Sequence, residues 1–156
     1  MLQVGDKAPQ FILKSDKDEE ISLSQLLNTK PVILYFYPKD NTSGCTQEAC
    51  SFRDNLPEFD SKNAVILGVS PDSVKSHQGF VEKQKLNFTL LSDPEHEVAE
   101  AYGAWGEKSM YGRKYMGILR STFIIGRDGV IKYVFPKVKT AGHAEEVLKV
   151  IETLDL

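Results

Sequence analysis

Residues 31–50 of this 156-residue chain read PVILYFYPKDNTSGCTQEAC, and the character of the sequence changes once within them. From Val32 to Tyr37 every side chain is aliphatic or aromatic, which is typical of a β-strand covered on both faces. The polar residues that follow lead into a helix that we expect to begin at about Gly44. A buried strand that runs directly into a helix is the repeating unit of α/β proteins. The segment therefore predicts an α/β fold.

Strand-like and helix-like segments alternate on both sides of residues 31–50. A short hairpin is expected at the N-terminus, and the capping-box spacing of Ser22 and Gln25 predicts a short helix after it. The pair Asp128-Gly129 predicts a tight turn between two late strands. The other expected elements are strands over 64–69, 88–91, 122–125 and 130–135, and helices over 44–59, from 70–72 onward, over 93–102 and over 144–154. Residues 103–117 contain four glycines and are interpreted as an irregular loop.

Composition places the chain among globular proteins and limits its partners. Hydrophobic residues make up 41% and charged residues 26%, and 19 basic against 22 acidic residues give a net charge of −3. A chain of this length is expected to form one domain, residues 1–156. The net charge is negative, which disfavours binding to the phosphate backbone of a nucleic acid. The longest apolar run is far shorter than the roughly 20 residues of a membrane helix, so no such helix is expected. The first residues, MLQVGDK, lack a signal-peptide pattern, so we expect a cytoplasmic protein with reduced thiols.

The expected chemistry depends on two cysteines, Cys45 and Cys50. Ligands of α/β sheets gather at the carboxyl ends of the strands, and Cys45 falls there, in the first turn of the expected helix. A free thiol is only about 3% thiolate at pH 7, and a helix N-terminus contributes only about 0.3–1 kcal/mol to an anion. A reactive thiolate at Cys45 therefore needs a cation from elsewhere. Arg120, directly before the apolar run 121–125, is the candidate, and the Thr42 hydroxyl can join the same hydrogen-bond network.

Cys45 and Cys50 cannot form a disulfide within a regular helix. Five helical residues separate their Cα atoms by about 8.6 Å, whereas a disulfide tolerates at most about 7 Å. The bond can form only if the first turns of the helix unwind. A redox reaction between the two sulfurs would therefore be coupled to local unfolding.

Each of these residues also has an ordinary structural interpretation. A cytosolic cysteine is most often a buried, unreactive hydrophobe, Thr42 can be a turn residue, and Pro38 can simply end the strand. A solvated surface would account for the basic residues Lys108, Arg113, Lys114 and Arg120. A metal site is disfavoured, because the three histidines show no ligand spacing with the cysteines.

The segment around Cys45 resembles the active site of the peroxiredoxins. Pro38, Thr42 and Cys45 have the spacing of the motif Pro-x-x-x-Thr-x-x-Cys of that family. The wider sequence is similar to the subfamily called bacterioferritin comigratory protein, or peroxiredoxin Q. This similarity covers nearly the whole chain and includes VGDKAP at 4–9, most of 37–54, YGAWGEK at 102–108, RSTFII at 120–125 and GHAEEVL at 142–148. Gly126 departs from the subfamily, whose members often carry Asp there, but it lies outside the motif.

The resemblance implies a thioredoxin-like α/β fold, with a central mixed sheet flanked by helices and an N-terminal β-hairpin extension. It assigns Cys45 as the peroxidatic cysteine and Cys50 as the resolving cysteine. The remaining catalytic assignments are hydrogen bonding by Thr42 and Arg120, shielding of the pocket by Pro38, and orientation of the arginine by Glu48.

The activity implied by the resemblance is that of a thioredoxin-dependent peroxidase. The Cys45 thiolate would reduce hydrogen peroxide and organic hydroperoxides and become a sulfenic acid, which would then form a disulfide with Cys50. Thioredoxin or a similar dithiol would reduce that disulfide. No metal or other cofactor is expected. The subfamily implies a monomer or a weak homodimer.

Two other functions are compatible with parts of the sequence. A general thiol–disulfide oxidoreductase would share the fold, but such enzymes use Cys-x-x-Cys, and the spacing here is wider. A holdase-like or structural partner protein would use the aromatic residues of the expected loop, Trp105, Tyr111 and Tyr115.

Overall fold

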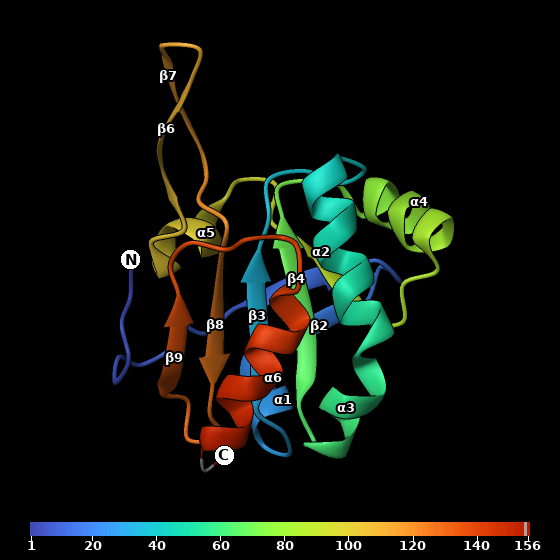
Figure 1. The fold of residues 1–156 in the computed structure, drawn as a ribbon, viewed down its shortest axis with the longest axis vertical. Coiled ribbons are helices and arrows are strands. Elements are labelled where there is room, and N and C mark those ends of the chain that lie inside the picture. The colour runs from blue at the N-terminus through green and yellow to red at the C-terminus, as the bar shows by residue number, and fades with distance from the viewer. Residues whose placement is uncertain (155) are drawn as a thin grey trace.

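Over residues 1–154 and 156, which the computed structural model describes, the chain forms a seven-stranded mixed sheet with helices on both faces (Figure 1). The strand order is β2-β1-β5-β4-β3-β8-β9. The centre consists of the parallel strands β3 (Val32–Phe36), β4 (Val65–Ser70) and β5 (Thr89–Ser92). Their carboxyl ends therefore meet at one edge of the sheet, as the expected α/β pattern requires.

Antiparallel strands complete the sheet on both sides. Strand β8 (Ser121–Ile125) pairs with β3, and β9 (Ile131–Phe135) pairs with β8 through the turn that contains Gly129. At the other side β1 (Ile12–Ser15) and β2 (Glu20–Ser22) form the N-terminal hairpin, and β1 pairs with β5. The expected N-terminal hairpin and the Asp128-Gly129 turn are both confirmed.

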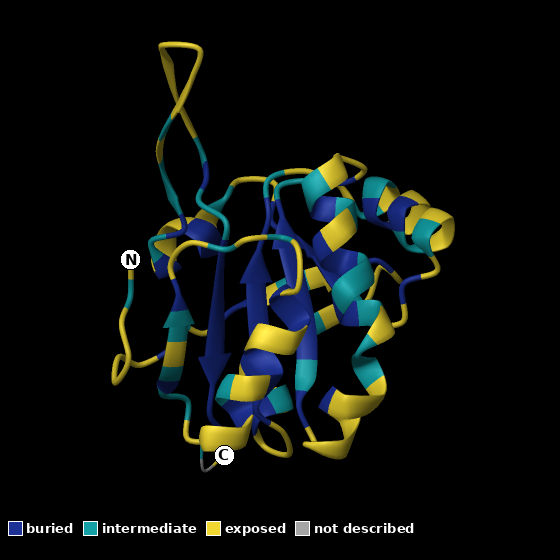
Figure 2. Ribbon diagram, viewed as in Figure 1, coloured by how far each residue is buried: buried dark blue, intermediate teal, exposed yellow. Residues whose placement is uncertain are grey.

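Strand β3 is buried on both faces because helices cover both sides of the sheet. Its alternate side chains belong to two separate cores: Leu34 lies in the core that contains α1 (Leu23–Leu27) and α5 (Glu97–Tyr102). Tyr35 lies in the core under the other helices, which are α2 (Ser43–Asp54), α3 (Leu56–Ser61), α4 (Val74–Gln84) and α6 (His143–Thr153). Figure 2 shows the sheet as the buried centre of the molecule.

Several helix boundaries differ from those expected. The helix expected over 44–59 is two helices, α2 and α3, which meet at Asn55. The helix expected from 70–72 onward begins at Val74, because Ser70 still belongs to β4 and the capping side chain is that of Ser73, which accepts a hydrogen bond from the Ser76 amide.

Two further helix starts also differ from the prediction. Helix α5 begins at Glu97 rather than at 93, although Asp93 still contributes to its start by accepting hydrogen bonds from the amides of Val98 and Ala99. The expected capping box at the start of α1 does not form, since the Ser22 side chain makes no cap hydrogen bond and its hydroxyl instead contacts that of Ser24.

The segment expected as an irregular loop is a β-hairpin. Strands β6 (Trp105–Met110) and β7 (Arg113–Ile118) pair along their whole length, and Tyr111 and Gly112 make the turn with positive φ angles of 53° and 79°. The hairpin projects from the body of the molecule (Figure 1), and its outer half is exposed (Figure 2). With solvent around both faces, its strands have no core to impose the alternation of apolar and polar residues that predicts a strand.

Within the described part of the chain no helix is long and apolar enough to span a membrane.

Candidate active site

Cys45 lies in the first turn of α2, directly after the loop that leaves the carboxyl end of β3. This is the reactive edge at which the sequence places it. Cys45 is 1% exposed, and both cysteines are free thiols rather than partners in a disulfide. Thr42 is the N-cap residue, and its carbonyl accepts a hydrogen bond from the Thr46 amide. The sulfur is therefore held in a tight turn of helix, out of bulk water.

Arg120 supplies the cation that a thiolate at this position needs. Its Nη2 donates to Cys45 Sγ at 3.2 Å, and its Nη1 donates to Glu48 Oε1 at 2.6 Å. Although burial works in the opposite direction, the charges of Glu48 and Cys45 raise the pKa of Arg120, so the guanidinium stays positive. One planar group thus fixes the position of the sulfur and the carboxylate together.

Glu48 lies three residues after Cys45, on the same face of α2. Its side chain has no exposed area, and its Oε2 has no hydrogen-bond partner among the described residues. Burial raises the pKa of Glu48 to about 7, against the opposing effects of the Arg120 charge and hydrogen bond. The raised pKa agrees with the geometry, because the carboxyl group is buried and only one of its two oxygens accepts a hydrogen bond.

Tyr35 lies in the same buried cluster as Cys45, a proximity that the sequence does not indicate. Its hydroxyl is buried and has no hydrogen-bond partner among the residues described. Burial, followed by the charges of Glu48 and Cys45, raises the pKa of Tyr35 well above 10, so the hydroxyl stays neutral. Gly68 on the neighbouring strand makes room for it, since a Cβ there would lie 2.7 Å from the Tyr35 ring. In the sequence Tyr35 is simply one more residue of an apolar strand.

Thr42 and Pro38 lie in the loop before α2. The Thr42 hydroxyl donates to the Lys39 carbonyl at 3.0 Å. Among the described residues it makes no hydrogen bond to the sulfur and accepts none from an amide of the first turn. Pro38 is half-buried. The structure therefore brings Arg120 into direct contact with Cys45, and Glu48 into contact with Arg120, whereas Thr42 is close in sequence but turned towards its own loop.

Cys50 lies further along α2 and does not contact Cys45. It is half-buried, and its Sγ is 3.7 Å from Gln84 Oε1 at the end of α4. Arg53, three residues further along α2, also contacts Gln84, since its Nη1 donates to the Gln84 carbonyl at 2.6 Å. The carboxyl half of α2 is thus held against α4. The helix between the two cysteines is intact, and in this geometry their sulfurs are too far apart to form a disulfide.

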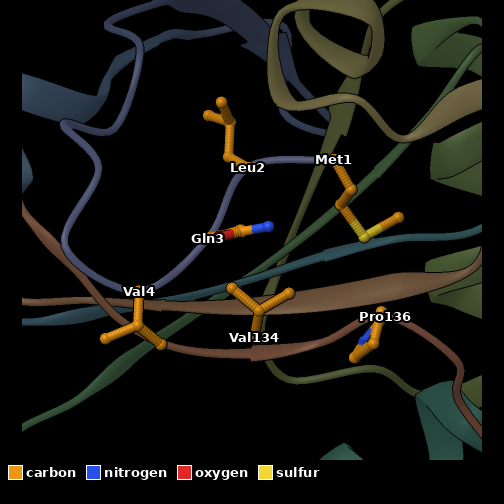
Figure 3. Close-up of a pocket in the computed structure, with 6 residues that line it drawn as sticks. All are labelled: Met1, Leu2, Gln3, Val4, Val134 and Pro136. Atoms are coloured by element: carbon orange, nitrogen blue, oxygen red, sulfur yellow. The ribbon is translucent and has the colours of Figure 1, made fainter.

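A cavity of about 370 Å³ opens beside Arg120. Its other lining residues are Lys108, Leu119, Pro136, Lys137 and Val138. Lys108 extends into this region from the hairpin, and burial, followed by the charge of Arg120, lowers the pKa of its amine. A second hollow, of about 290 Å³, lies between the N-terminal residues and the β9 region (Figure 3). Its side chains include no nucleophile, acid or base, and none of them belongs to the Cys45 site.

Known proteins resemble this chain along almost its whole length. Residues 4–134 match the AhpC/TSA family. A putative peroxiredoxin bcp of Coxiella burnetii is 52% identical over 147 residues, which is 94% of this chain and 97% of that protein. A PrxQ of Xylella fastidiosa superimposes with a TM-score of 0.92 at 39% identity, covering 98% of this chain and 97% of the other.

A third similar protein is the bacterioferritin comigratory protein of Xanthomonas campestris, whose structure is described in terms of alkyl peroxide reduction activity. It has a TM-score of 0.86 and 41% identity, over 92% of this chain and 90% of that one. The thioredoxin-like fold and the resemblance of the chain to the peroxiredoxins are both confirmed by these similarities. The chain therefore belongs to the AhpC/TSA family, and within it the chain is a peroxiredoxin of the Bcp, or peroxiredoxin Q, type, a thiol peroxidase.

Proposed function

We propose that the Cys45 thiolate reduces hydrogen peroxide and organic hydroperoxides. The observation that carries this proposal is the 3.2 Å contact between Arg120 Nη2 and Cys45 Sγ in the first turn of a helix. Thiolate is the nucleophilic form of cysteine, and both a cation and a helix N-terminus favour it. The alkyl peroxide activity named for the Xanthomonas campestris relative supports the organic substrates.

In the first step the Cys45 sulfur attacks one peroxide oxygen. A sulfur–oxygen bond forms and the oxygen–oxygen bond breaks, so the sulfur is oxidised to a sulfenic acid and the peroxide is reduced. The departing oxygen takes up a proton and leaves as water or an alcohol. Arg120 lines the adjacent cavity, and its guanidinium is placed to stabilise negative charge on that oxygen. Glu48 orients Arg120, and Pro38, in the loop before α2, shields the pocket.

In the second step Cys50 attacks the sulfenic acid, forms a disulfide with Cys45 and releases water. This requires the first turns of α2 to unwind, and the contacts of α2 favour unwinding at that end. Its first turn contains Gly44 and no acidic residue, and Thr42 makes no side-chain cap hydrogen bond. The opposite end is held to α4 through Arg53. Thioredoxin or a similar dithiol then reduces the disulfide by exchange.

Intact-mass measurement with a thiol count, before and after one equivalent of peroxide, tests both steps. The wild type should lose two hydrogens and both free thiols. Cys50→Ser should gain one oxygen and should complete a first turnover but fail in thioredoxin-coupled turnover. Cys45→Ser should not consume peroxide at all. Peroxide consumption by Cys45→Ser would refute the assignment of the nucleophile, and coupled turnover by Cys50→Ser would refute the resolving role.

A further inference from the structure

A buried hydrogen-bond network surrounds Asp40, five residues before Cys45, and the steps above do not use it. Asp40 is 4% exposed and His77 is fully buried. Three side chains bond to the Asp40 carboxylate: the Tyr37 hydroxyl donates to Oδ1 at 2.6 Å, the Ser76 hydroxyl donates to Oδ2 at 2.8 Å, and His77 Nδ1 lies 2.7 Å from Oδ2. The carboxylate is thus fully enclosed by polar partners.

The partners of His77 define where its protons lie. Its Nε2 is 2.9 Å from the Leu91 carbonyl, which can only accept, so Nε2 carries a proton. A second proton lies between Nδ1 and Asp40. The hydroxyls of Tyr37 and Ser76 both donate to the carboxylate. The result is a buried, hydrogen-bonded Asp40–His77 pair, a contact that is costly to break because buried polar groups would remain without a partner.

This network ties the loop before α2 to the rigid edge of the sheet. The Asp40 amide donates to Asp72 Oδ2 at 2.8 Å, and the hydroxyl of Ser70, at the end of β4, donates to the same oxygen at 2.7 Å. The Ser92 hydroxyl, at the end of β5, donates to the Asp72 carbonyl. Side-chain atoms of Asp40, Asp72 and His77 lie within 4.8 Å of one another, but they already bond to protein groups, so the cluster is an anchor rather than a cation site.

The residues directly after the anchor lie at the surface. Asn41 adopts the left-handed conformation with a φ of 65°, which asparagine tolerates better than most residues, and residues 41–43 are exposed. Four residues therefore separate the buried, hydrogen-bonded Asp40 from the sulfur that has to move. When the first turn of α2, which begins at Ser43, unwinds, the released segment stays attached to the Asp40 anchor.

We propose that Asp40 and His77 are positioning residues that hold the loop before α2 and so set the balance between the two steps of the reaction. With the anchor in place, Cys45 is held against Arg120, which favours the attack on peroxide and disfavours unwinding. This inference rests on the proposed disulfide mechanism. It predicts that a weaker anchor slows the first step and speeds the second.

The test is Asp40→Asn, which keeps the shape of the side chain and removes its charge. We expect the rate constant of Cys45 with hydrogen peroxide to fall about three- to tenfold, because the sulfur is positioned less well. Disulfide formation should become about tenfold faster, equivalent to about 1.4 kcal/mol. Less sulfinic acid should then accumulate in excess peroxide, because the sulfenic acid is consumed sooner. Quenched-flow trapping of the sulfenic acid, read by mass spectrometry, measures both steps separately.

Asp93→Asn is the matched control. Asp93 is also buried, at 3% exposure, and its carboxylate also accepts two hydrogen bonds, but these come from the start of α5. We expect the Asp93→Asn variant to be less stable in thermal unfolding, and its rate constants for reaction with peroxide and for disulfide formation to equal those of the wild type. Ser76→Ala removes a single donor to Asp40 and covers the case in which Asp40→Asn does not fold. Its rate constants should change in the same two directions, by smaller factors.

Opposite changes in the two steps, absent from Asp93→Asn, would support the proposal. Unchanged rate constants, or a change in the same direction for both steps, in Asp40→Asn or, if it does not fold, in Ser76→Ala, would overturn it. Failure of the wild type to form the Cys45–Cys50 disulfide would instead refute the proposed function, so the two failures are distinguishable.

Discussion

In the proposed mechanism the reactivity of Cys45 depends on Arg120, whose guanidinium contacts both the sulfur and Glu48. Arg120→Met removes the positive charge and both donors while keeping much of the side-chain volume. We expect the rate constant with hydrogen peroxide to fall by about 10²–10³, the usual effect of removing a donor that stabilises charge in the transition state. Stopped-flow or competition kinetics measure it.

The control for this prediction is Arg127→Met. Arg127 is exposed, and its Nη2 donates to the Asn28 carbonyl, at the end of α1. The same substitution there should leave the rate constant unchanged. An Arg120→Met variant that reacts with peroxide as fast as the wild type would show that the guanidinium is not needed.

Glu48 gives the stability of the protein a specific pH dependence. Burial raises its pKa from 4.5 to about 7 in the folded state, so the folded state holds this proton more tightly than the unfolded state does. Its contribution is therefore present below pH 4.5 and is lost as pH rises towards and through 7. The loss amounts to about 3 kcal/mol, at about 1.4 kcal/mol per tenfold change in proton affinity.

Glu48→Gln, which cannot ionise, should remove this component. Between pH 5 and 8 the free energy of unfolding of the variant should fall less steeply than that of the wild type, as measured by urea denaturation at several pH values. Glu82→Gln changes an exposed residue of α4 and should retain the wild-type slope. Parallel curves for Glu48→Gln and the wild type would contradict the raised pKa.

At the scale of the element, we expect the first turn of α2 to set the ease of the proposed unwinding. Gly44 lies within the helix, and a Cβ there would meet Arg120 Nη2 and the Thr140 side chain at 3.5 Å, an ordinary contact. Gly44→Ala should therefore be accommodated and should stabilise the turn by up to about 1 kcal/mol. We expect disulfide formation to slow up to about fivefold and more sulfinic acid to accumulate in excess peroxide.

Gly79→Ala is the matched helix substitution, since Gly79 lies within α4 and a Cβ there would meet nothing within 4 Å. It should stabilise the protein by a similar amount without changing the rate of disulfide formation. Equal rates in Gly44→Ala and Gly79→Ala would mean that unwinding of the first turn does not limit the second step.

At the scale of the whole molecule, the sheet and the hairpin differ in what they contribute to stability. Phe123 is fully buried and packs edge-on against Phe36 and Tyr102, with centroid distances of 5.8 and 5.3 Å. Phe123→Ala should cost about 3–5 kcal/mol. Tyr111, at the hairpin tip, is 99% exposed, so Tyr111→Ser should change stability by less than about 0.5 kcal/mol. Urea denaturation of both variants checks this, and a large loss in Tyr111→Ser would mean that the tip is packed in solution.

Much of the architecture could be predicted from the sequence because its signals are local. The apolar run of β3, the Asp128-Gly129 turn and the apolar residues spaced three and four apart in α6, such as Ala144, Val147 and Leu148, each depend on residues a few positions apart. The hairpin at 105–118 could not be predicted, because strands exposed on both faces lack the alternation that a core imposes. Helix starts such as that of α4 were misplaced because several residues in a row, from Ser70 to Ser73, could act as the cap.

By itself the sequence determined that the chain has an α/β core and that a cysteine follows a buried strand at the start of a helix. Only the tertiary structure decided which side chains meet that cysteine. Phe36 pairs with Ser121 in the antiparallel register of β3 and β8, so Arg120 emerges at the edge where α2 begins. Likewise the Asp40–His77 pair joins residues 37 positions apart. Strand and helix periodicity is a property of neighbouring residues, whereas such meetings depend on strand register and helix packing, which form only in the folded chain.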